Sequence, residues 1–388
     1  MEPFALNIRH LRAVAAVVET GSISAAARVV NLTQPAITQG IAKIERQIGL
    51  SLFERRSGGM TPTAAANVLA RRVSAALRLM DCRHATAAQI SAFLALSRRG
   101  SYAGAARETG LSEPSLHRAV GDLSLTIGHI LVERRGRGVT LTARGAAVAR
   151  RFRLGEAELR SAMSELASLE GREVERITLG AMPLSRARLL PAAVTAFHAL
   201  HRDVDIGIIE GSYAELVGPL RDGEIDMMIG ALRSAGFDEG IIQTPLFEDR
   251  PVILARAGHP LAGARGAATP DEMLAYPWIT PALGTPLRSQ WQAMFEAAGG
   301  VAPRVPIECG SVIMIRQMLL QSDFLTLLSP DQVALELEAG WLVKVADAPG
   351  DVSRTIGVTT RSDWRPTVLQ GRFLDVLTEQ AAIIAADA

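Results

Sequence analysis

Residues 21–64 read GSISAAARVVNLTQPAITQGIAKIERQIGLSLFERRSGGMTPTA, and the same pattern returns 79 positions later. Residues 100–143 read GSYAGAARETGLSEPSLHRAVGDLSLTIGHILVERRGRGVTLTA, which aligns without a gap and is identical at 17 of 44 positions. A solenoid needs more than one repetition, because its core forms only when several units stack on one another. The sequence therefore predicts a small domain that is present twice.

Each copy predicts two helices joined by a tight turn. In the first copy, Ser22 can cap a helix over 23–30, and Thr33 can cap a second helix that ends before Gly49. Isoleucines at 37, 41, 44 and 48 recur at helical spacing and should face the core, so the opposite face is polar. We expect that polar face to enter the major groove of DNA. Its candidate contact residues are Thr33, Gln34, Pro35, Thr38, Gln39 and Lys43.

A two-stranded wing is predicted after each polar-faced helix, because charged residues there precede a glycine turn. Arg55 and Arg56 of the first wing are expected to contact phosphates. In the second copy the candidates are Ser115, His117, Arg118, Arg134, Arg135 and Arg137. Glu113 and Asp122 replace Gln34 and Lys43 there, which makes the first copy the better predicted reader. The alternative is that only one copy reads DNA and the other is a structural or protein-interaction module.

The charge is divided unevenly along the chain. Residues 1–155 contain 22 Lys and Arg against 9 Asp and Glu, whereas residues 156–388 contain 19 against 31. A basic front half and an acidic back half indicate that only the front half meets a polyanion. Charge alone leaves open that the basic residues merely keep the helices soluble.

The repeated pattern resembles the DNA-binding domain of LysR-type transcriptional regulators, closely in the first copy and more loosely in the second. The shared motifs are Ala-Ala-Arg, a Thr/Ser-x-Pro helix start, Ile-Gly-Leu, Leu-Phe-Glu-Arg and Thr-x-Thr-Ala. This resemblance implies a winged helix-turn-helix that binds double-stranded DNA and a homodimer or homotetramer, with RNA polymerase as a further partner. It also implies a regulator rather than an enzyme, although a module in which the winged domains serve assembly is a rival interpretation.

A long amphipathic helix is predicted over 141–171, either continuous or broken at Gly155. The resemblance implies that this linker helix pairs with its counterpart in a dimer. The expected domains are 1–84 and 85–145 for the two winged units, 146–172 for the linker or dimerisation helix, and 173–388 for an effector-binding domain.

From residue 176 onward, short apolar strands alternate with helices, which predicts an α/β fold. The segments LGAMPLSRARLLP and IGVTTRSDWRPT resemble the LysR effector domain, which is similar to type 2 periplasmic-binding proteins. That resemblance implies two lobes, the first over about 177–252 and 355–388 and the second over about 253–354.

A small-molecule inducer is expected between the lobes, at strand ends that face helix N-termini. The candidate contacts are Pro183, Leu184, Ser185 and Ser212 in the first lobe, and Thr280, Pro281, Thr285, Gly310 and Ser311 in the second. Hydroxyls and free amides with few fixed cations suit a carboxylate or sugar-like compound. Each of these residues is as readily explained as an ordinary helix cap.

Several classes of protein are not supported by the sequence. The seven histidines are scattered, and no phosphate loop or nucleophile elbow is present, so we expect no catalytic residues, metal or cofactor. Cys82 and Cys309 lie far apart and form no disulfide framework. The apolar stretch 13–18 is too short to cross a membrane, which makes a cytoplasmic protein the expectation.

Overall fold

The computed structural model describes residues 3–56, 59–82, 84–136, 138–233, 239–263, 267–297, 299–348 and 353–387. The first winged unit, here called head one, follows the short turn η1 (Pro3–Ala5). Its elements are α1 (Ile8–Thr20), α2 (Ile23–Val30), α3 (Gln34–Ile48), β1 (Phe53–Arg56) and β2 (Gly59–Pro62). Head two has the same element order, with α5 (Ala87–Arg99), α6 (Tyr102–Thr109), α7 (Glu113–Ile127), β3 (Val132–Arg135) and β4 (Gly138–Leu141).

Local capping chemistry explains the helix ends of head one. Ser22 accepts from the backbone N–H of Ala25 at the start of α2, and Thr33 accepts from that of Ala36 at the start of α3. Gly49 ends α3 in the left-handed conformation, with φ of 78°, which glycine adopts without steric cost. The predicted caps of both helices are therefore confirmed.

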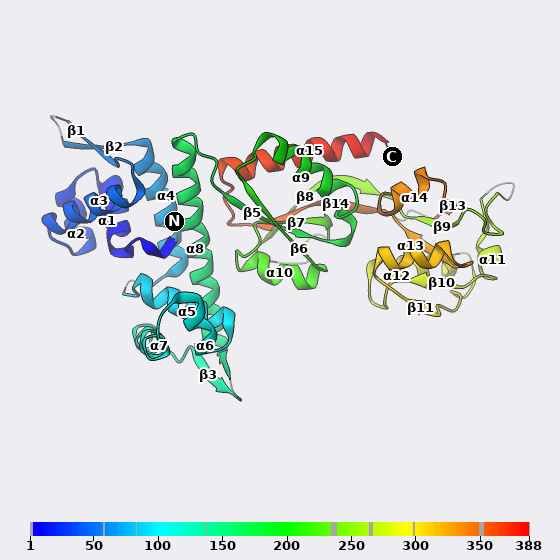
Figure 1. The fold of residues 1–388 in the computed structure, drawn as a ribbon, viewed down its shortest axis with the longest axis horizontal. Helices are drawn as coiled ribbons and strands as arrows, with labels where there is room; N and C mark the ends of the chain where they lie inside the picture. Colours follow the sequence, from blue (N-terminus) through cyan, green and yellow to red (C-terminus); the bar gives the residue numbers. More distant parts are fainter. Residues whose placement is uncertain are drawn as a thin grey trace.

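A long helix follows each head, and these two helices pack against each other. They are α4 (Ala64–Met80) and α8 (Ala143–Leu169), which run antiparallel along each other (Figure 1). Helix α8 is continuous through Gly155, which settles the alternative that the sequence left open. The face of α8 that we expected to meet a second chain is covered by α4 of the same chain.

The second half of the chain contains two five-stranded sheets, and these confirm the predicted α/β class. The first lobe has the strand order β6-β5-β7-β14-β8 and the second lobe β11-β10-β12-β9-β13. First-lobe elements are β5 (Arg176–Ala181), η2 (Pro183–Ser185), α9 (Leu189–Leu200), β6 (Asp205–Glu210), α10 (Tyr213–Arg221), β7 (Met227–Ala231), β8 (Ile241–Asp249), β14 (Arg354–Arg361) and α15 (Val368–Asp387). Second-lobe elements are β9 (Val252–Arg256), α11 (Pro270–Met273), β10 (Trp278–Thr280), α12 (Pro286–Ala297), β11 (Ile307–Glu308), α13 (Val312–Leu320), β12 (Leu325–Leu328), η3 (Pro330–Val333), α14 (Ala334–Glu338) and β13 (Leu342–Asp347).

At the start of α8, Gly145 lies so close to the neighbouring backbone that there is no room for an added methyl group. A Cβ at Gly145 would lie 1.9 Å from the carbonyl oxygen of Leu131. Gly145→Ala is therefore expected to destabilise the protein by about 1–3 kcal/mol, because backbone must move to make room. Thermal denaturation should show a lower midpoint than for the wild type.

Gly121 in α7 provides the matched control for this substitution. A Cβ at Gly121 meets nothing within 4 Å, so Gly121→Ala is expected to stabilise the helix by about 0.5–1 kcal/mol. If both variants raised the midpoint, the close approach at Gly145 would be wrong.

Candidate DNA-binding interface and effector domain

Helix α3 presents a polar face to solvent because its apolar face is fixed in the core. Ile37, Ile41 and Ile44 are at most 3% exposed, and Ile48 packs at the edge of the same core, as the spacing predicted. All six candidates of this segment are exposed: Thr33, Gln34, Pro35, Thr38, Gln39 and Lys43. An exposed row of amide and hydroxyl groups on one helix face can reach base edges in a major groove, and the ammonium group beside them can reach the phosphates.

Neighbouring residues hold parts of this face in place. The amide nitrogen of Gln34 donates to the hydroxyl of Ser24 on α2 at 3.1 Å. His10 of α1 lies directly beneath α3, since a Cβ at Gly40 would be 3.0 Å from its ring. Burial first, then the charge of Lys43, lowers the pKa of His10, so a neutral ring supports the recognition helix. Sequence pattern gave no indication of this role for His10.

The wing of head one is the antiparallel pair β1 and β2, in which Arg55 is opposite Met60 and Arg56 is opposite Gly59. The backbone is therefore arranged as predicted. The side chains of Arg55 and Arg56 lie outside the described part of the structure.

Head two exposes a different set of side chains. Ser115, His117 and Arg118 are exposed on α7, but the ring of His117 stacks on Tyr102 with ring centroids 3.5 Å apart. Arg134 and Arg135 are exposed on β3. The acidic residues Glu113 and Asp122 are exposed on α7 too, and Arg137 lies outside the described residues.

In the first lobe, the effector candidates lie at the carboxyl ends of β5 and β6. Pro183 and Ser212 are exposed and Leu184 is half-buried, whereas Ser185 is fully buried and its hydroxyl donates to the carbonyl of Met182. Ser212 caps α10 in a mutual arrangement with the Glu215 side chain.

Arg186 lies at the same strand ends, although the sequence pattern did not single it out. Its guanidinium donates to the carbonyl oxygens of Ala181 at 3.0 Å and Gly211 at 3.2 Å. A charged group is therefore fixed where few fixed cations were expected, although it also pairs with the carboxylate of Glu210 at 3.0 Å.

In the second lobe, adjacent strand ends bring most of the candidates together. The N–H of Cys309 donates to the carbonyl of Thr280, so Thr280 and Pro281 lie beside the Gly310–Ser311 turn. The Thr280 side chain is buried and accepts a hydrogen bond from Arg288 of α12. Thr285, which is half-buried, donates to the carbonyl of Ala282. Arg288 is buried, and it is a second cation that the pattern did not single out.

The two lobes contact each other next to the first-lobe candidates. The side chain of Gln332 donates to the Pro183 carbonyl at 3.3 Å, and Arg188 pairs with Asp331 at 3.1 Å. These contacts connect the end of β5 to the η3 segment of the second lobe.

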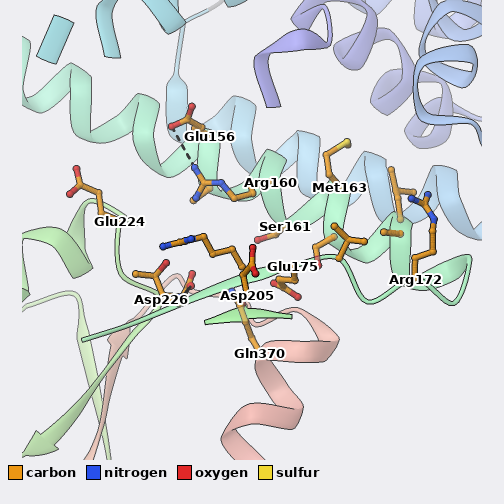
Figure 2. A pocket seen from close by; sticks show the side chains of 18 of the residues that line it. Glu156, Arg160, Ser161, Met163, Arg172, Glu175, Asp205, Glu224, Asp226 and Gln370 are labelled. Carbon is orange, nitrogen blue, oxygen red and sulfur yellow. Dashed lines mark hydrogen bonds and ion pairs between the residues drawn. The ribbon is translucent and has the colours of Figure 1, made fainter. Parts of the chain in front are cut away.

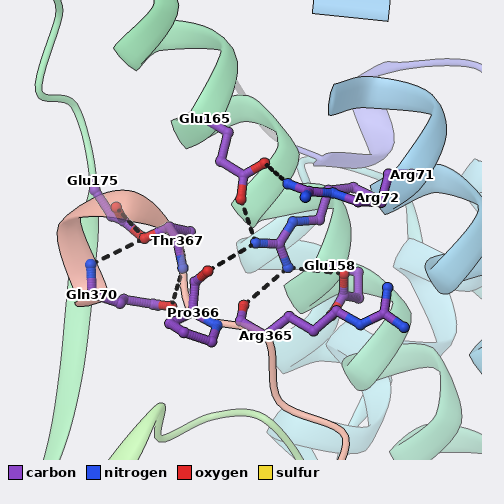
Figure 3. Close-up of polar contacts among 9 residues, drawn as sticks. All are labelled: Arg71, Arg72, Glu158, Glu165, Glu175, Arg365, Pro366, Thr367 and Gln370. Carbon is purple, nitrogen blue, oxygen red and sulfur yellow. Dashed lines mark hydrogen bonds and ion pairs between the residues drawn. The ribbon is translucent and has the colours of Figure 1, made fainter. Parts of the chain in front are cut away.

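A buried ionic cluster connects the long helices α4 and α8, which follow the two heads, to the first lobe (Figure 3). Arg72 of α4 is 1% exposed, and its guanidinium donates to Glu158 at 3.1 Å and to Glu165, both on α8. It also donates to the carbonyl oxygens of Arg365 at 3.0 Å and Pro366 at 3.4 Å in the first lobe. Burial lowers the pKa of Arg72, but its hydrogen bonds and charge pairs with Glu165 and Glu158 outweigh this, and the pKa is raised.

A cavity of about 1320 Å³ lies between α8 and the first lobe (Figure 2). Its walls combine polar and apolar side chains, and the polar ones include Arg160, Glu175, Asp226 and Gln370. Burial raises the pKa of both Glu175 and Asp226. None of the nine effector candidates lines this cavity, so it is distinct from the predicted inducer site.

The described residues contain no group of three His, Cys, Asp or Glu side chains arranged to hold a metal ion. Among the helices they form, none has the length and apolarity needed to cross a bilayer.

Models of known protein families match most of the chain. A model described as the LysR substrate binding domain matches residues 170–382. A second model, described as the bacterial regulatory helix-turn-helix protein of the lysR family, matches two segments, residues 8–67 and 87–146. The first model covers the two lobes, and the two segments matched by the second model cover head one and head two.

Individual proteins are similar to the chain over different lengths. The HTH-type transcriptional regulator GalR of Pseudomonas putida is 31% identical over 392 residues, which cover 97% of this chain and 98% of that protein. The SDS degradation transcriptional activation protein of a Pseudomonas species is 34% identical over 271 residues, or 69% of this chain and 86% of that protein. The structure of a full-length OxyR variant from Pseudomonas aeruginosa matches 76% of this chain and 94% of that one, with a TM-score of 0.57 and 20% identity. The similarity to GalR alone among these three extends over both heads and both lobes.

Proposed function

Since the chain belongs to the LysR family of transcriptional regulators, we propose that it reads specific duplex DNA sequences through its winged heads under the control of a small-molecule inducer. A DNA-binding regulator with an effector-binding domain accounts for both halves of the chain. The observation that carries the proposal is the exposed polar face of α3 above a buried isoleucine face.

In this proposal α3 lies in the major groove. Gln34, Thr38 and Gln39 contact base edges, while Lys43 and the wing residues Arg55 and Arg56 contact phosphates. Head two contributes through Arg118, with Arg134, Arg135 and Arg137 on phosphates. Head one is the stronger reader, because exposed carboxylates on α7 repel the DNA backbone where α3 has an amide and an ammonium group.

The inducer in this proposal binds between the lobes and carries a carboxylate or is sugar-like. The guanidinium group of Arg288, next to candidate residues in the second lobe, supports the carboxylate. The inducer would bind one arrangement of the lobes more tightly than another, and its binding would therefore increase the population of that arrangement. The first-lobe carbonyls bonded to Arg72 provide the route by which that change reaches the heads. Assembly into a homodimer or homotetramer and contact with RNA polymerase complete the proposal.

Gln39→Ala tests the reading role of α3. An alanine cannot make the paired hydrogen bonds of an amide with a base, so discrimination at one base pair should fall by about 1–3 kcal/mol. Affinity for random duplex should change little. Competition binding on a duplex selected by the wild-type chain from a random library measures both quantities.

Two further variants make this experiment specific. Lys43→Ala should weaken selected and random duplexes alike, because a phosphate contact carries no sequence information. Gln321→Ala removes an exposed amide in the second lobe and should leave both affinities unchanged. If Gln39→Ala discriminated between base pairs as well as the wild type does, α3 of head one would not be the reading helix.

A further inference from the structure

The paired helices α4 and α8 bury equivalent faces. A shift of 79 residues along the chain, which relates the two heads in sequence, places seven buried residues of α4 on seven buried residues of α8. The pairs are Ala66 with Gly145, Leu69 with Val148, Ala70 with Ala149, Val73 with Phe152, Ala75 with Leu154, Ala76 with Gly155, and Met80 with Leu159. The residues that α4 buries are therefore the sequence equivalents of residues that α8 buries.

The two helices also cross at equivalent residues. Gly155 approaches Ala76 so closely that a Cβ on it would be 3.3 Å from the Ala76 carbonyl oxygen. In an antiparallel pair, a contact between a residue and its own equivalent marks a two-fold axis.

Contacts on either side of this crossing are consistent with the axis. Arg72 reaches across to Glu158 on α8, and the equivalent Arg151 reaches back to the Leu79 carbonyl at 3.2 Å and to Asp81 at 2.6 Å. The α4–α8 contact therefore has the arrangement of a symmetric dimer interface, formed within one chain.

This interface is completed by apolar packing. One continuous hydrophobic core includes both heads, α4 and α8, from Leu6 to Leu166. The η1 segment of head one contacts α5 and α8, so the first head is also held against the second. Another chain could use this surface of α8 only after α4 had been displaced.

We propose that a single chain is a covalently linked pair of DNA-binding heads, which binds one duplex carrying two half-sites in opposite orientation. This inference rests on the proposed function. Figure 1 shows head one beside the helix pair, on the side away from the lobes, and head two at its lower end, with the two wings at opposite ends. In this proposal one duplex contacts both recognition helices.

The two half-sites have different sequences, because the two recognition helices differ. Gln39 of α3 suits adenine, which an amide can bind through two hydrogen bonds. The equivalent residue of α7 is Arg118, whose guanidinium suits guanine. The operator is thus asymmetric, unlike the palindrome read by two identical single-headed chains.

The test begins with duplexes that the full chain selects from a random library. On the selected duplex, an insertion of about 5 bp, half a helical turn, between the half-sites should lower affinity by on the order of 10²–10⁴, since it removes one head from the DNA. A single half-site, or an unchanged affinity after insertion, would overturn the inference. Selection of no duplex at all would overturn the proposed function and the inference with it.

A disulfide tests the pairing without DNA. A Cβ on Gly155 would be 2.5 Å from Cγ of Met80, so cysteines at 80 and 155 place their Cβ atoms within about 4 Å, which suits a disulfide. Met80→Cys with Gly155→Cys, in a chain carrying Cys82→Ser and Cys309→Ser, should oxidise to a bond within one chain. In a non-reducing denaturing gel it should migrate as one chain, and it should keep its affinity for the selected duplex. Oxidation to two-chain species would instead show that heads pair between chains.

Discussion

Arg72→Ala is expected to destabilise the head pair by about 3–5 kcal/mol, because it leaves buried carboxylates without their cation. Glu158 and Glu165 are each 8% exposed, and the Arg72 guanidinium bonds to both. Amide hydrogen exchange in α4 and α8 measures the change directly. The most protected amides there should exchange faster by on the order of 10²–10³, if they exchange through opening of the head pair.

Arg71 is the matched control, since it precedes Arg72 and pairs with the same Glu165 at 2.9 Å. Its side chain is 59% exposed, and exposed pairs contribute about 0–1 kcal/mol. Arg71→Ala should therefore be nearly neutral. A chain with Arg72→Met, Glu158→Gln and Glu165→Gln should recover most of the lost stability, because no buried charge is left unpaired. Equal losses for Arg71→Ala and Arg72→Ala would contradict the argument from burial.

The same substitution should affect the first lobe. Arg72 bonds to the carbonyls of Arg365 and Pro366, and the neighbouring Thr367 bonds to Glu175 near the end of α8 (Figure 3). Faster exchange in the segment 362–371 of the Arg72→Ala chain is expected for that reason. Faster exchange in this segment would show that Arg72 couples the heads to the first lobe, which carries half of the proposed inducer site.

Features fixed by local chemistry could be predicted from sequence. Caps at Ser22 and Thr33, the glycine at the end of α3, and the buried isoleucines all follow from residues close together in the chain. Strand β8 is hard to predict from sequence, because Gln243, Thr244 and Pro245 interrupt its apolar run. A proline is tolerated there because β8 is the edge strand of its sheet.

Long-range partners were not accessible in the same way. The apolar face of α8 shows in the sequence that something covers it, but not whether the cover is α4 or another chain. Arg72 follows Arg71 on a helix rich in alanine and leucine, and an arginine in such a place normally faces solvent. Its burial follows from Glu158 and Glu165, which are distant in sequence and adjacent only after folding. Arg186 and Arg288 were overlooked for the same reason, since their partners are set by the fold.

The basic charge of the heads predicts a steep dependence of DNA binding on salt. Residues 1–155 have 13 more basic than acidic residues, and both wings carry adjacent arginines. If the two heads together make about 6–10 phosphate contacts, affinity should fall by roughly 10³–10⁵ between about 50 and 200 mM salt, because bound cations are released from the DNA. Fluorescence anisotropy of a labelled duplex across that range gives the slope of log affinity against log salt.

Substitutions in the wing of head two test which residues contribute to this slope. Arg134 and Arg135 are exposed on β3, and each phosphate contact contributes about 0.9 to the slope. A chain with Arg134→Ala and Arg135→Ala should therefore show a slope shallower by up to about 1.8, whereas Arg304→Ala in the second lobe should leave it unchanged. An unchanged slope in the double variant would mean that head two does not touch the duplex, and affinity independent of salt in the wild type would rule out DNA binding through these basic surfaces. A reduced slope would mean that head two contacts the backbone of the bound duplex, because only phosphate contacts of head two are removed.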